Sequence, residues 1–269
     1  MVRFRHEQVG GILGNDPIFD PGVLLNLIIL EPHEVGPSGD VVLSNGRATH
    51  LRTVLKVAPG DEVRVGLLDG PRGAGTVASI SEETVVLRCL FEEEIPPRPP
   101  VDLLLALPRP KVMRRIWAQA AALGVGQIIL TNAERVERNY FDTHILTPEC
   151  YRPLLIEGLQ QARDTRLPAV SIHRQFRVLI EDRLEGLFGR GLRLMADPGA
   201  ARPAGAAARE ADGRRLLLAV GPEGGWNDFE RNLLTAHGFQ PAGMGPRTLR
   251  TDTACIALLA LVHDAIKGS

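Results

Sequence analysis

The sequence predicts an α/β protein in which a small β-barrel precedes a domain with a mostly parallel sheet. Four prolines within residues 96–100 divide the chain, because proline cannot continue a helix and holds the backbone extended. Before this run, short strand-like segments alternate with turn residues. After it, buried strands alternate with amphipathic helices. We therefore expect an extension at residues 1–22, the barrel at 23–95, a linker at 96–100 and the α/β domain at 101–269.

The predicted barrel contains several short strands and one helix. Its strands are expected at residues 27–30, 62–68, 73–80 and 84–91. Turn signals such as Pro59-Gly60-Asp61 separate neighbouring strands. The helical stretch after the first strand places four apolar side chains on one face, those of Ala48, Leu51, Val54 and Leu55.

The predicted α/β domain alternates strands and helices. Strands are expected at residues 101–107, 127–131, 169–173, 192–196, 216–220 and 239–244. Helices are expected at residues 110–123, 154–163, 178–188, 227–237 and 251–266. Pro110 suits a first helical turn, Gly124 suits a helix end, and Asn227 with Glu230 matches a capping box. Residues 200–211 are rich in small side chains and are predicted as a loop.

Composition places the chain among ordinary globular proteins. Of its 269 residues, 44% are hydrophobic and 23% are charged. No apolar run reaches the roughly 18 residues of a membrane span, and residues 1–22 lack the apolar core of a secretory signal, so a cytoplasmic location is expected. Cys89, Cys150 and Cys255 are far apart, and no set of side chains has metal-ligand spacing. We therefore expect no membrane span and no metal.

Basic residues concentrate in the middle of the chain and are nearly all arginines. Residues 96–190 carry 14 basic and 10 acidic side chains, whereas residues 1–95 carry 8 and 14. Arginine suits phosphates and base edges because its planar group donates hydrogen bonds in pairs. A compositional bias toward arginine explains the count equally well. The pattern permits a nucleic-acid partner without showing one.

Two loops with glycines follow the last two predicted strands, at the positions where open α/β sheets bind ligands. The first is residues 221–226, Gly-Pro-Glu-Gly-Gly-Trp, and the second is residues 243–254. Glycine lets the backbone turn sharply and approach a ligand closely, although an ordinary strand-to-helix turn also explains the first loop. The second loop lacks the third glycine of a dinucleotide fingerprint. Asp252, beside a helix start, is also explained by the helix macrodipole.

A basic cluster follows the first strand of the α/β domain. Arg109, Lys111, Arg114 and Arg115 lie at the expected start of the next helix. Such a cluster suits phosphates, and a solvated helix face is the alternative. Two further pairs are similar weak signals, Arg135 with Arg138 and Arg163 with Arg166.

Residues 216–225 (LLLAVGPEGG) and 244–254 (MGPRTLRTDTA) together resemble the 16S ribosomal RNA (uracil-N3) methyltransferase family, called RsmE. The resemblance implies a SPOUT-type knotted sheet domain, whose carboxyl-terminal segment threads a trefoil knot, preceded by a PUA-like RNA-binding barrel. It also implies S-adenosylmethionine as methyl donor and a homodimer with active sites at the subunit interface. The implied partner is 16S rRNA or the small ribosomal subunit.

The resemblance also assigns roles to residues. Arg250 is expected to stabilise negative charge on the uracil, and Asp252 to orient Arg250 or accept the N3 proton. The family usually has glutamate where this chain has Asp252. RNA contacts are expected from Arg52, Arg109, Lys111, Arg114, Arg163 and Arg166. Cofactor contacts are expected from Leu105, Leu107, Val220, Gly221, Pro222, Glu223, Gly224, Gly225, Met244, Gly245, Arg247, Leu249, Thr253 and Ala254.

Two other functions remain open at this point. One is a non-catalytic RNA-binding or ribosome-assembly protein that retains the knotted fold. The other is a related RNA methyltransferase with a different target nucleotide. The sequence does not identify the target nucleotide, nor does it distinguish naked RNA from an assembled subunit as the substrate.

Overall fold

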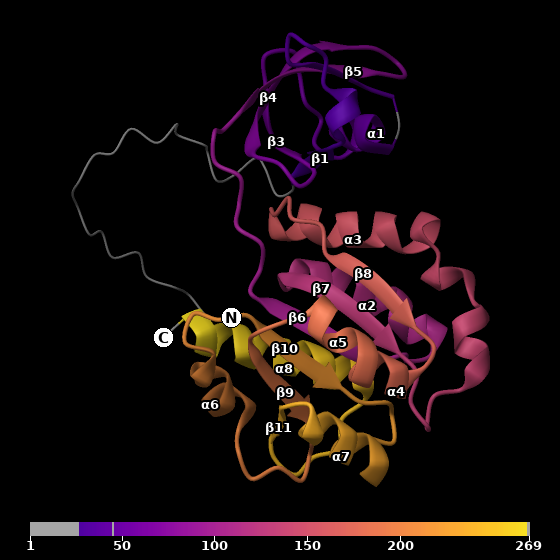
Figure 1. Cartoon of the computed structure of the whole chain (residues 1–269). Coiled ribbons are helices and arrows are strands. Elements are labelled where there is room, and N and C mark those ends of the chain that lie inside the picture. The colour runs from indigo at the N-terminus through magenta and orange to yellow at the C-terminus, as the bar shows by residue number, and fades with distance from the viewer. Residues whose placement is uncertain (1–26, 45, 268–269) are drawn as a thin grey trace, which may run out of the picture.

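Two sheets organise the protein in a computed structural model that describes residues 27–44 and 46–267 (Figure 1). One sheet has five strands and the other six, and the proline-rich segment at residues 96–100 leads from the first to the second. The predicted extension at residues 1–22 lies outside the described residues. The described residues form two hydrophobic cores: one lies within the first sheet's part of the chain, and the larger one is centred on the second sheet and also takes in Leu27, Ile29 and Leu68.

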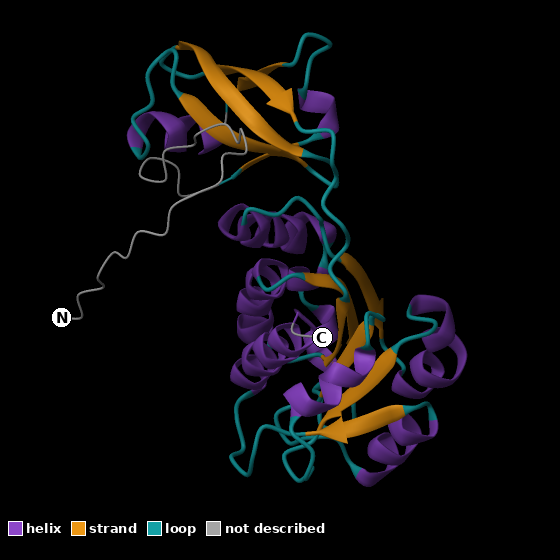
Figure 2. Cartoon of the chain, turned by 90° about the vertical axis from the view of Figure 1, so that its left-hand side faces the viewer, coloured by secondary structure: helices purple, strands orange, loops and turns teal. Residues whose placement is uncertain are grey.

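The first sheet is mostly antiparallel and curls into a half-barrel (Figure 2). Its strand order is β1-β3-β4-β5-β2, with β1 parallel to β3. The strand at residues 40–43 was not predicted, because only Val41 and Leu43 of its four side chains are buried and no long apolar run marks it. The strands are β1 (Ile28–Leu30), β2 (Asp40–Leu43), β3 (Glu62–Leu67), β4 (Arg72–Ile80) and β5 (Val85–Phe91).

Among the described residues of this part, one α-helix, α1 (Gly46–Thr53), packs against the sheet, and a short 3-10 turn at Pro32–Glu34 precedes it. Ala48 and Leu51 are buried, as the helical pattern predicts. Val54 is 63% exposed, so its predicted place on the apolar face is wrong. The reason is that the helix ends at Thr53, one residue before Val54 would extend that face.

The second sheet is parallel throughout, in the order β11-β9-β10-β6-β7-β8. Every residue of the two central strands is buried, which explains their continuous apolar sequence. The predicted strand at residues 239–244 ends two residues early, at Ala242. The strands are β6 (Val101–Ala106), β7 (Val125–Thr131), β8 (Ala169–His173), β9 (Leu192–Ala196), β10 (Leu216–Val220) and β11 (Phe239–Ala242).

Helices cover both faces of this sheet (Figure 2). On one face, α2 contacts both α3 and α8, and α8 lies over β6 and β10. Gly124, with a φ of +77°, follows the end of α2, and Asn227 with Glu230 forms the predicted capping box of α7. The helices are α2 (Pro110–Ala122), α3 (Pro148–Ala162), α4 (Phe176–Val178), α5 (Leu184–Leu187), α6 (Ala204–Ala208), α7 (Asp228–Ala236) and α8 (Thr251–Lys267). Short 3-10 turns lie at Arg138–Asp142, His144–Leu146 and Arg209–Ala211.

Three helix predictions in this domain need correction. The small-residue segment at 200–211 contains α6, whose alanines pack against α8, so a loop was wrong there. The helix expected at 154–163 begins at Pro148 and tolerates Pro153 inside it. The helix expected at 178–188 is broken by a π-helical turn at Leu179–Arg183. None of the described helices has the length and apolar character needed to cross a membrane.

Hydrogen bonds fix the first sheet against the second part of the chain. Thr165, fully buried between α3 and β8, donates from Oγ1 to the Gly70 carbonyl at 2.6 Å. The Thr165 carbonyl accepts from the Asp69 amide at 2.8 Å. Arg152 of α3 pairs with both carboxylate oxygens of Glu31, at 2.5 and 3.0 Å. These contacts hold the half-barrel above α3 (Figure 1).

A buried carboxylate lies at the opposite edge of the parallel sheet from the carboxyl ends of its strands. Asp102 of β6 is completely buried and accepts a hydrogen bond from Arg215, which directly precedes β10. Burial raises the pKa of the Asp102 carboxyl from 3.8 to about 6, and the neighbouring guanidinium counteracts part of that rise. Asp102 is therefore a buried group whose ionisation opposes folding.

Asp102→Asn is expected to reduce the fall in stability between about pH 4 and pH 6. Because the folded-state pKa of Asp102 is above its ordinary value, the free energy of unfolding falls as pH rises through this window, by up to about 3 kcal/mol. Urea titrations across that range measure the slope. Asp212→Asn, at an exposed position, is the control. The assignment fails if Asp102→Asn keeps the parent's slope.

Candidate functional site

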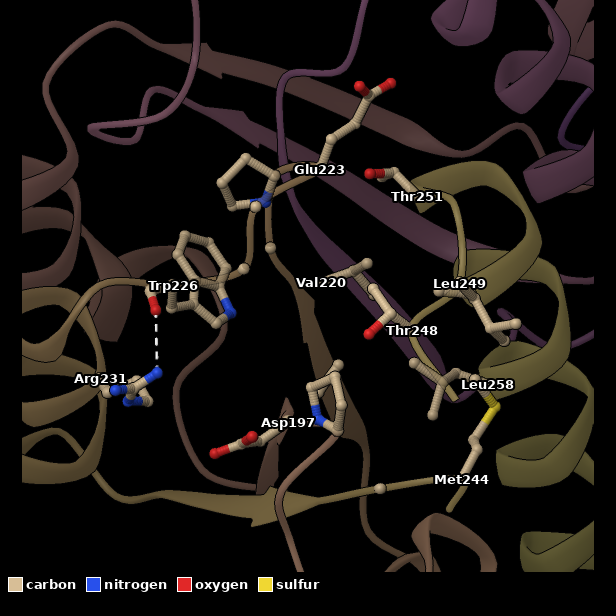
Figure 3. Close-up of a pocket in the computed structure, with 18 of the residues that line it drawn as sticks. Asp197, Val220, Glu223, Trp226, Arg231, Met244, Thr248, Leu249, Thr251 and Leu258 are labelled. Atoms are coloured by element: carbon tan, nitrogen blue, oxygen red, sulfur yellow. Dashed lines mark hydrogen bonds between the residues drawn. The ribbon is translucent and has the colours of Figure 1, made fainter. Parts of the chain in front are cut away.

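A cavity of about 420 Å³ opens at the carboxyl ends of β9, β10 and β11 (Figure 3). Its wall combines residues 196–198, 220–228 and 242–245 with the segment that enters α8. Figure 3 shows Glu223 and Thr251 at one end of the cavity and Asp197 and Met244 at the other. Ligands bind at this edge of open α/β sheets because the loops there converge.

The first loop keeps its main chain close to the cavity. A side chain at Gly221 would lie 3.2 Å from the indole and the amide of Trp226, so glycine lets the indole pack against the backbone. Gly225 has a φ of +72°, which glycine adopts without strain, and its amide donates to the Pro222 carbonyl at 2.8 Å. Trp226 is buried, lines the cavity and packs against Phe176, with ring centroids 5.5 Å apart.

The second loop crosses the chain that follows β9. The Gly243 amide donates to the Arg202 carbonyl at 2.9 Å, and the Gly243 carbonyl accepts from the Ala204 amide at 2.8 Å. A side chain at Gly243 would lie 2.8 Å from the Asp197 carbonyl, closer than real side chains approach. Gly245 then turns the chain with a φ of +99°. Glycine is therefore required for this passage.

Arg135 connects the loop after β7 to the first glycine loop. Its guanidinium donates to the carbonyls of Gly224 and Gly225, the second at 3.3 Å. Its Cδ occupies the space that a side chain at Gly224 would need, at 2.7 Å. Only a weak charge signal marks this residue in the sequence, because the contact joins loops about 90 residues apart. Arg135 is thus a cavity residue that sequence reasoning missed.

The carboxylates at the rim are held by arginines. Glu223 pairs with Arg109 at 3.2 Å, and both side chains remain partly exposed. Asp252 pairs with Arg115 of α2. The hydrogen bond from Arg115 holds the pKa of the Asp252 carboxyl below its ordinary value, and the Thr253 amide adds to this effect. Asp252 is therefore a weakly basic carboxylate.

The structure brings most of the predicted cofactor residues into one wall. The predicted cofactor residues that line the cavity are Val220, Gly221, Pro222, Glu223, Gly224, Gly225, Met244, Gly245, Arg247, Leu249 and Ala254. Leu105 and Leu107 are buried, and neither they nor Thr253 contributes to this wall. Trp226, Asp197, Thr248, Thr251 and Leu258 line it without having been predicted. Trp226, Thr248 and Thr251 lie inside the two loops that the sequence singled out as ligand loops, whereas Asp197 and Leu258 lie outside them.

The side chains of the two predicted catalytic residues, Arg250 and Asp252, do not pair with each other. Arg250 is exposed just before α8 and does not line the cavity. Asp252 turns to Arg115 instead of Arg250, in the part of the chain that the structure describes. The carbonyl of Arg250 accepts the Ala254 amide at 2.8 Å, which fixes its backbone to the first turn of α8.

The predicted RNA contacts fall in two regions. Arg109, Lys111 and Arg114 are exposed at the start of α2, beside the cavity rim. Arg166 donates to the Asp69 carbonyl at 2.9 Å between the two sheets, and Arg52 donates to the Glu82 carbonyl within the half-barrel. Arg163 ends α3 in a left-handed conformation. The first region alone presents side chains toward the edge that carries the cavity.

Fold and site together define an α/β protein with a candidate ligand cavity at the carboxyl ends of its parallel strands, formed largely by the loops that follow them. A family model described as an RNA methyltransferase domain matches residues 96–263. Ribosomal RNA small subunit methyltransferase E of Treponema pallidum is 33% identical, over 88% of this chain and 90% of that protein. The protein of that name from Synechocystis is 28% identical, over 91% and 80%. The chain therefore belongs to the ribosomal RNA small subunit methyltransferase E family, RsmE.

Solved structures share the fold at lower identity. A ribosomal RNA small subunit methyltransferase E from Neisseria gonorrhoeae, bound to S-adenosyl methionine, has a TM-score of 0.72 at 21% identity, covering 89% of this chain and 97% of that one. A methyltransferase from Legionella pneumophila, in complex with the same cofactor, has a TM-score of 0.68 at 22% identity, covering 90% and 98%. Both span nearly the whole of the two-sheet arrangement.

Proposed function

We propose that this protein transfers a methyl group from S-adenosylmethionine to N3 of a uracil in 16S rRNA of the small ribosomal subunit. Family membership supports the reaction class, since the relatives are named for methylation of small-subunit ribosomal RNA. The observation that carries the proposal is the glycine-lined cavity between the loops after β10 and β11. Both motifs that suggested the family meet in that cavity.

The cavity fits the cofactor in size and chemistry. Its volume of about 420 Å³ lies in the range of small-molecule sites, and Val220, Leu249 and Leu258 supply apolar surface for a nucleoside. A side chain at Gly243 would meet main-chain carbonyls at 2.8 and 3.1 Å, and one at Gly221 would lie 3.2 Å from Trp226, so at these two glycines the main chain forms the wall. Polar main-chain groups along both loops suit an adenosine. Two structures with this fold are described as bound to S-adenosylmethionine.

The cofactor, when bound, supplies an electrophilic methyl group, and the protein must position and charge-stabilise the uracil. Transfer of the N3 proton to water leaves negative charge spread over the uracil oxygens. We assign Arg250 to stabilise that charge, because it is an exposed cation on the loop that enters α8. Asp252, paired with Arg115, is better suited to holding the start of α8 than to accepting the proton. Holding the reacting groups in line supplies much of the rate enhancement.

We extend the proposal to the arrangement of the whole chain. The close crossing of Gly243 with Asp197 and Arg202 supports a trefoil knot of the SPOUT type at residues 101–269. Residues 23–95 are proposed as a PUA-like RNA-binding domain and 96–100 as the linker. Leu249 and Leu261, 37% and 43% exposed, are proposed to be covered in a homodimer whose active sites include both subunits. The enzyme is proposed to act in the cytoplasm.

RNA is proposed to approach across the start of α2. Arg109, Lys111 and Arg114 present exposed cations beside the cavity, where phosphate contacts would orient the substrate. Arg52, Arg163 and Arg166 are proposed to contact RNA farther from the cavity. The direct test incubates the protein with radiolabelled S-adenosylmethionine and small subunits from cells lacking the gene. One methyl group on a uracil of 16S rRNA is expected; cofactor binding without transfer would instead favour a non-catalytic assembly protein.

Gly245→Ala is expected to weaken S-adenosylmethionine binding about tenfold. An alanine at a φ of +99° is strained by about 1–2 kcal/mol, which favours a loop shape that no longer matches the ligand. Gly60→Ala in the half-barrel is the control, since Gly60 has a φ of +96° and open space around it, as Gly245 does. Both variants should lose similar stability, and only Gly245→Ala should lose affinity by calorimetry. Equal affinities would contradict the site.

Arg250→Ala is expected to lower kcat by about a hundredfold or more with the cofactor affinity unchanged, because a charge-stabilising donor acts on the transition state. Single-turnover methyl transfer at saturating cofactor measures the effect. Arg250→Lys should recover part of the rate by restoring the positive charge. Arg190→Ala, an exposed arginine at the opposite edge of the sheet, should be unaffected. A parental kcat in Arg250→Ala would remove Arg250 from the mechanism.

A further inference from the structure

A second hollow lies beside the cofactor cavity. It has a volume of about 310 Å³ and is formed by the loop after β7, the segment at the start of α4 and the start of α7. We call it the α7 groove. It shares Asn227 with the cofactor cavity, so the two hollows are neighbours on one edge of the sheet. Its walls are Asn132, Ala133, Glu134, Val136, Arg138, Phe176, Arg177, Asn227, Phe229 and Glu230.

Hydrogen bonds fix the wall between the groove and the cavity. The Glu134 amide donates to Glu230 Oε1 at 2.7 Å, and the Asn227 amide donates to Glu230 Oε2 at 2.8 Å. The neighbouring Arg135 binds the carbonyls of Gly224 and Gly225 on the cavity side. The loop after β7 and the first glycine loop are therefore one unit. A molecule seated in the groove has a set position relative to the cofactor cavity.

The groove presents an exposed aromatic ring and an arginine that forms no ion pair with the described residues. Phe229 is 56% exposed, unusual for a phenylalanine, and it lies in the first turn of α7. Arg138 is exposed, and among residues 27–44 and 46–267 it forms no ion pair. Arg177, by contrast, is held by Glu181 at 2.9 Å. Glu230 is buried and uses both oxygens on amides.

We propose that the α7 groove binds a nucleotide of single-stranded RNA that flanks the methylated base. The base stacks on Phe229, the backbone phosphate contacts Arg138, and Asn132 and Glu134 offer hydrogen-bond partners to the base edge. Single-stranded RNA is recognised by this combination of aromatic stacking and basic contacts. The proposal rests on the proposed function, because the methylated base must then lie in the adjacent cavity. A flanking nucleotide in this groove would set the register of the strand.

The test measures binding of a fluorescein-labelled decauridylate by fluorescence anisotropy in the presence of S-adenosylmethionine. Phe229→Ala is expected to weaken binding about tenfold, since stacking on one ring is worth roughly 1–3 kcal/mol per base. Phe229→Tyr should bind like the parent because it keeps the ring. Arg138→Ala should reduce the slope of log Kd against log salt by about 0.7, the contribution of one phosphate contact to a single strand.

Two control substitutions lie outside the groove. Asn232→Ala changes an exposed residue elsewhere on α7, and Arg190→Ala removes an exposed arginine from the opposite edge of the sheet. Both should bind the oligonucleotide as the parent does, and every variant should bind S-adenosylmethionine normally. Parental binding by Phe229→Ala and Arg138→Ala would overturn the proposal. The proposal would also be overturned if these two variants were defective only in binding assembled subunits, because the groove would then bind a ribosomal protein. Loss of cofactor binding or of methyl transfer in the parent would instead refute the proposed function.

Discussion

The crossing of two main-chain segments at Gly243 is the constraint on which the cavity depends. Gly243, directly after β11, forms main-chain hydrogen bonds with Arg202 and Ala204. The Asp197 carbonyl lies where a side chain at position 243 would be. The chain leaves the sheet's edge strand at this crossing and reaches α8, which lies over the central strands β6 and β10. The loops after β9, β10 and β11 converge only because this passage is so close. A bulkier residue would separate them and open the cavity.

Charged side chains line the cavity alongside the two glycine loops, and others form ion pairs at its rim. Arg109 with Glu223 and Arg115 with Asp252 form two ion pairs that link α2 to the two ligand loops. Exposed ion pairs of this kind contribute little to stability. Their main effect is to fix the position of the two loops relative to α2. A polyanionic substrate would compete for these arginines. The rim can therefore exchange internal pairs for phosphate contacts without disturbing the apolar wall formed by Val220 and Leu258.

Local signals in the sequence predicted local structure well. The Asn227–Glu230 capping box, the glycine after α2 and the apolar runs of β6 and β10 each depend on a few neighbouring residues, and each was confirmed. The helix α6 was missed because alanines and glycine resemble a flexible loop until α8 packs on them. Strand order and the contact of Arg135 with the glycine loop join residues far apart in the chain. No spacing rule in a single sequence contains that information. The glycine loops could be predicted because the backbone conformation that they require depends on residues that are consecutive in the sequence.

The joint between the two sheets limits how RNA can be held. Across it, the Asp69 amide donates to the Thr165 carbonyl and Thr165 Oγ1 donates to the Gly70 carbonyl. The Arg166 guanidinium donates to the Asp69 carbonyl. Glu31 and Arg152 add a paired contact on the far side of α3. Because these bonds come from both ends of α3, the half-barrel cannot swing freely about the proline-rich linker. An RNA that contacts both parts, as proposed, would have to match a fixed span, and the position of the half-barrel would then act with the cavity to select which nucleotide reaches the cofactor.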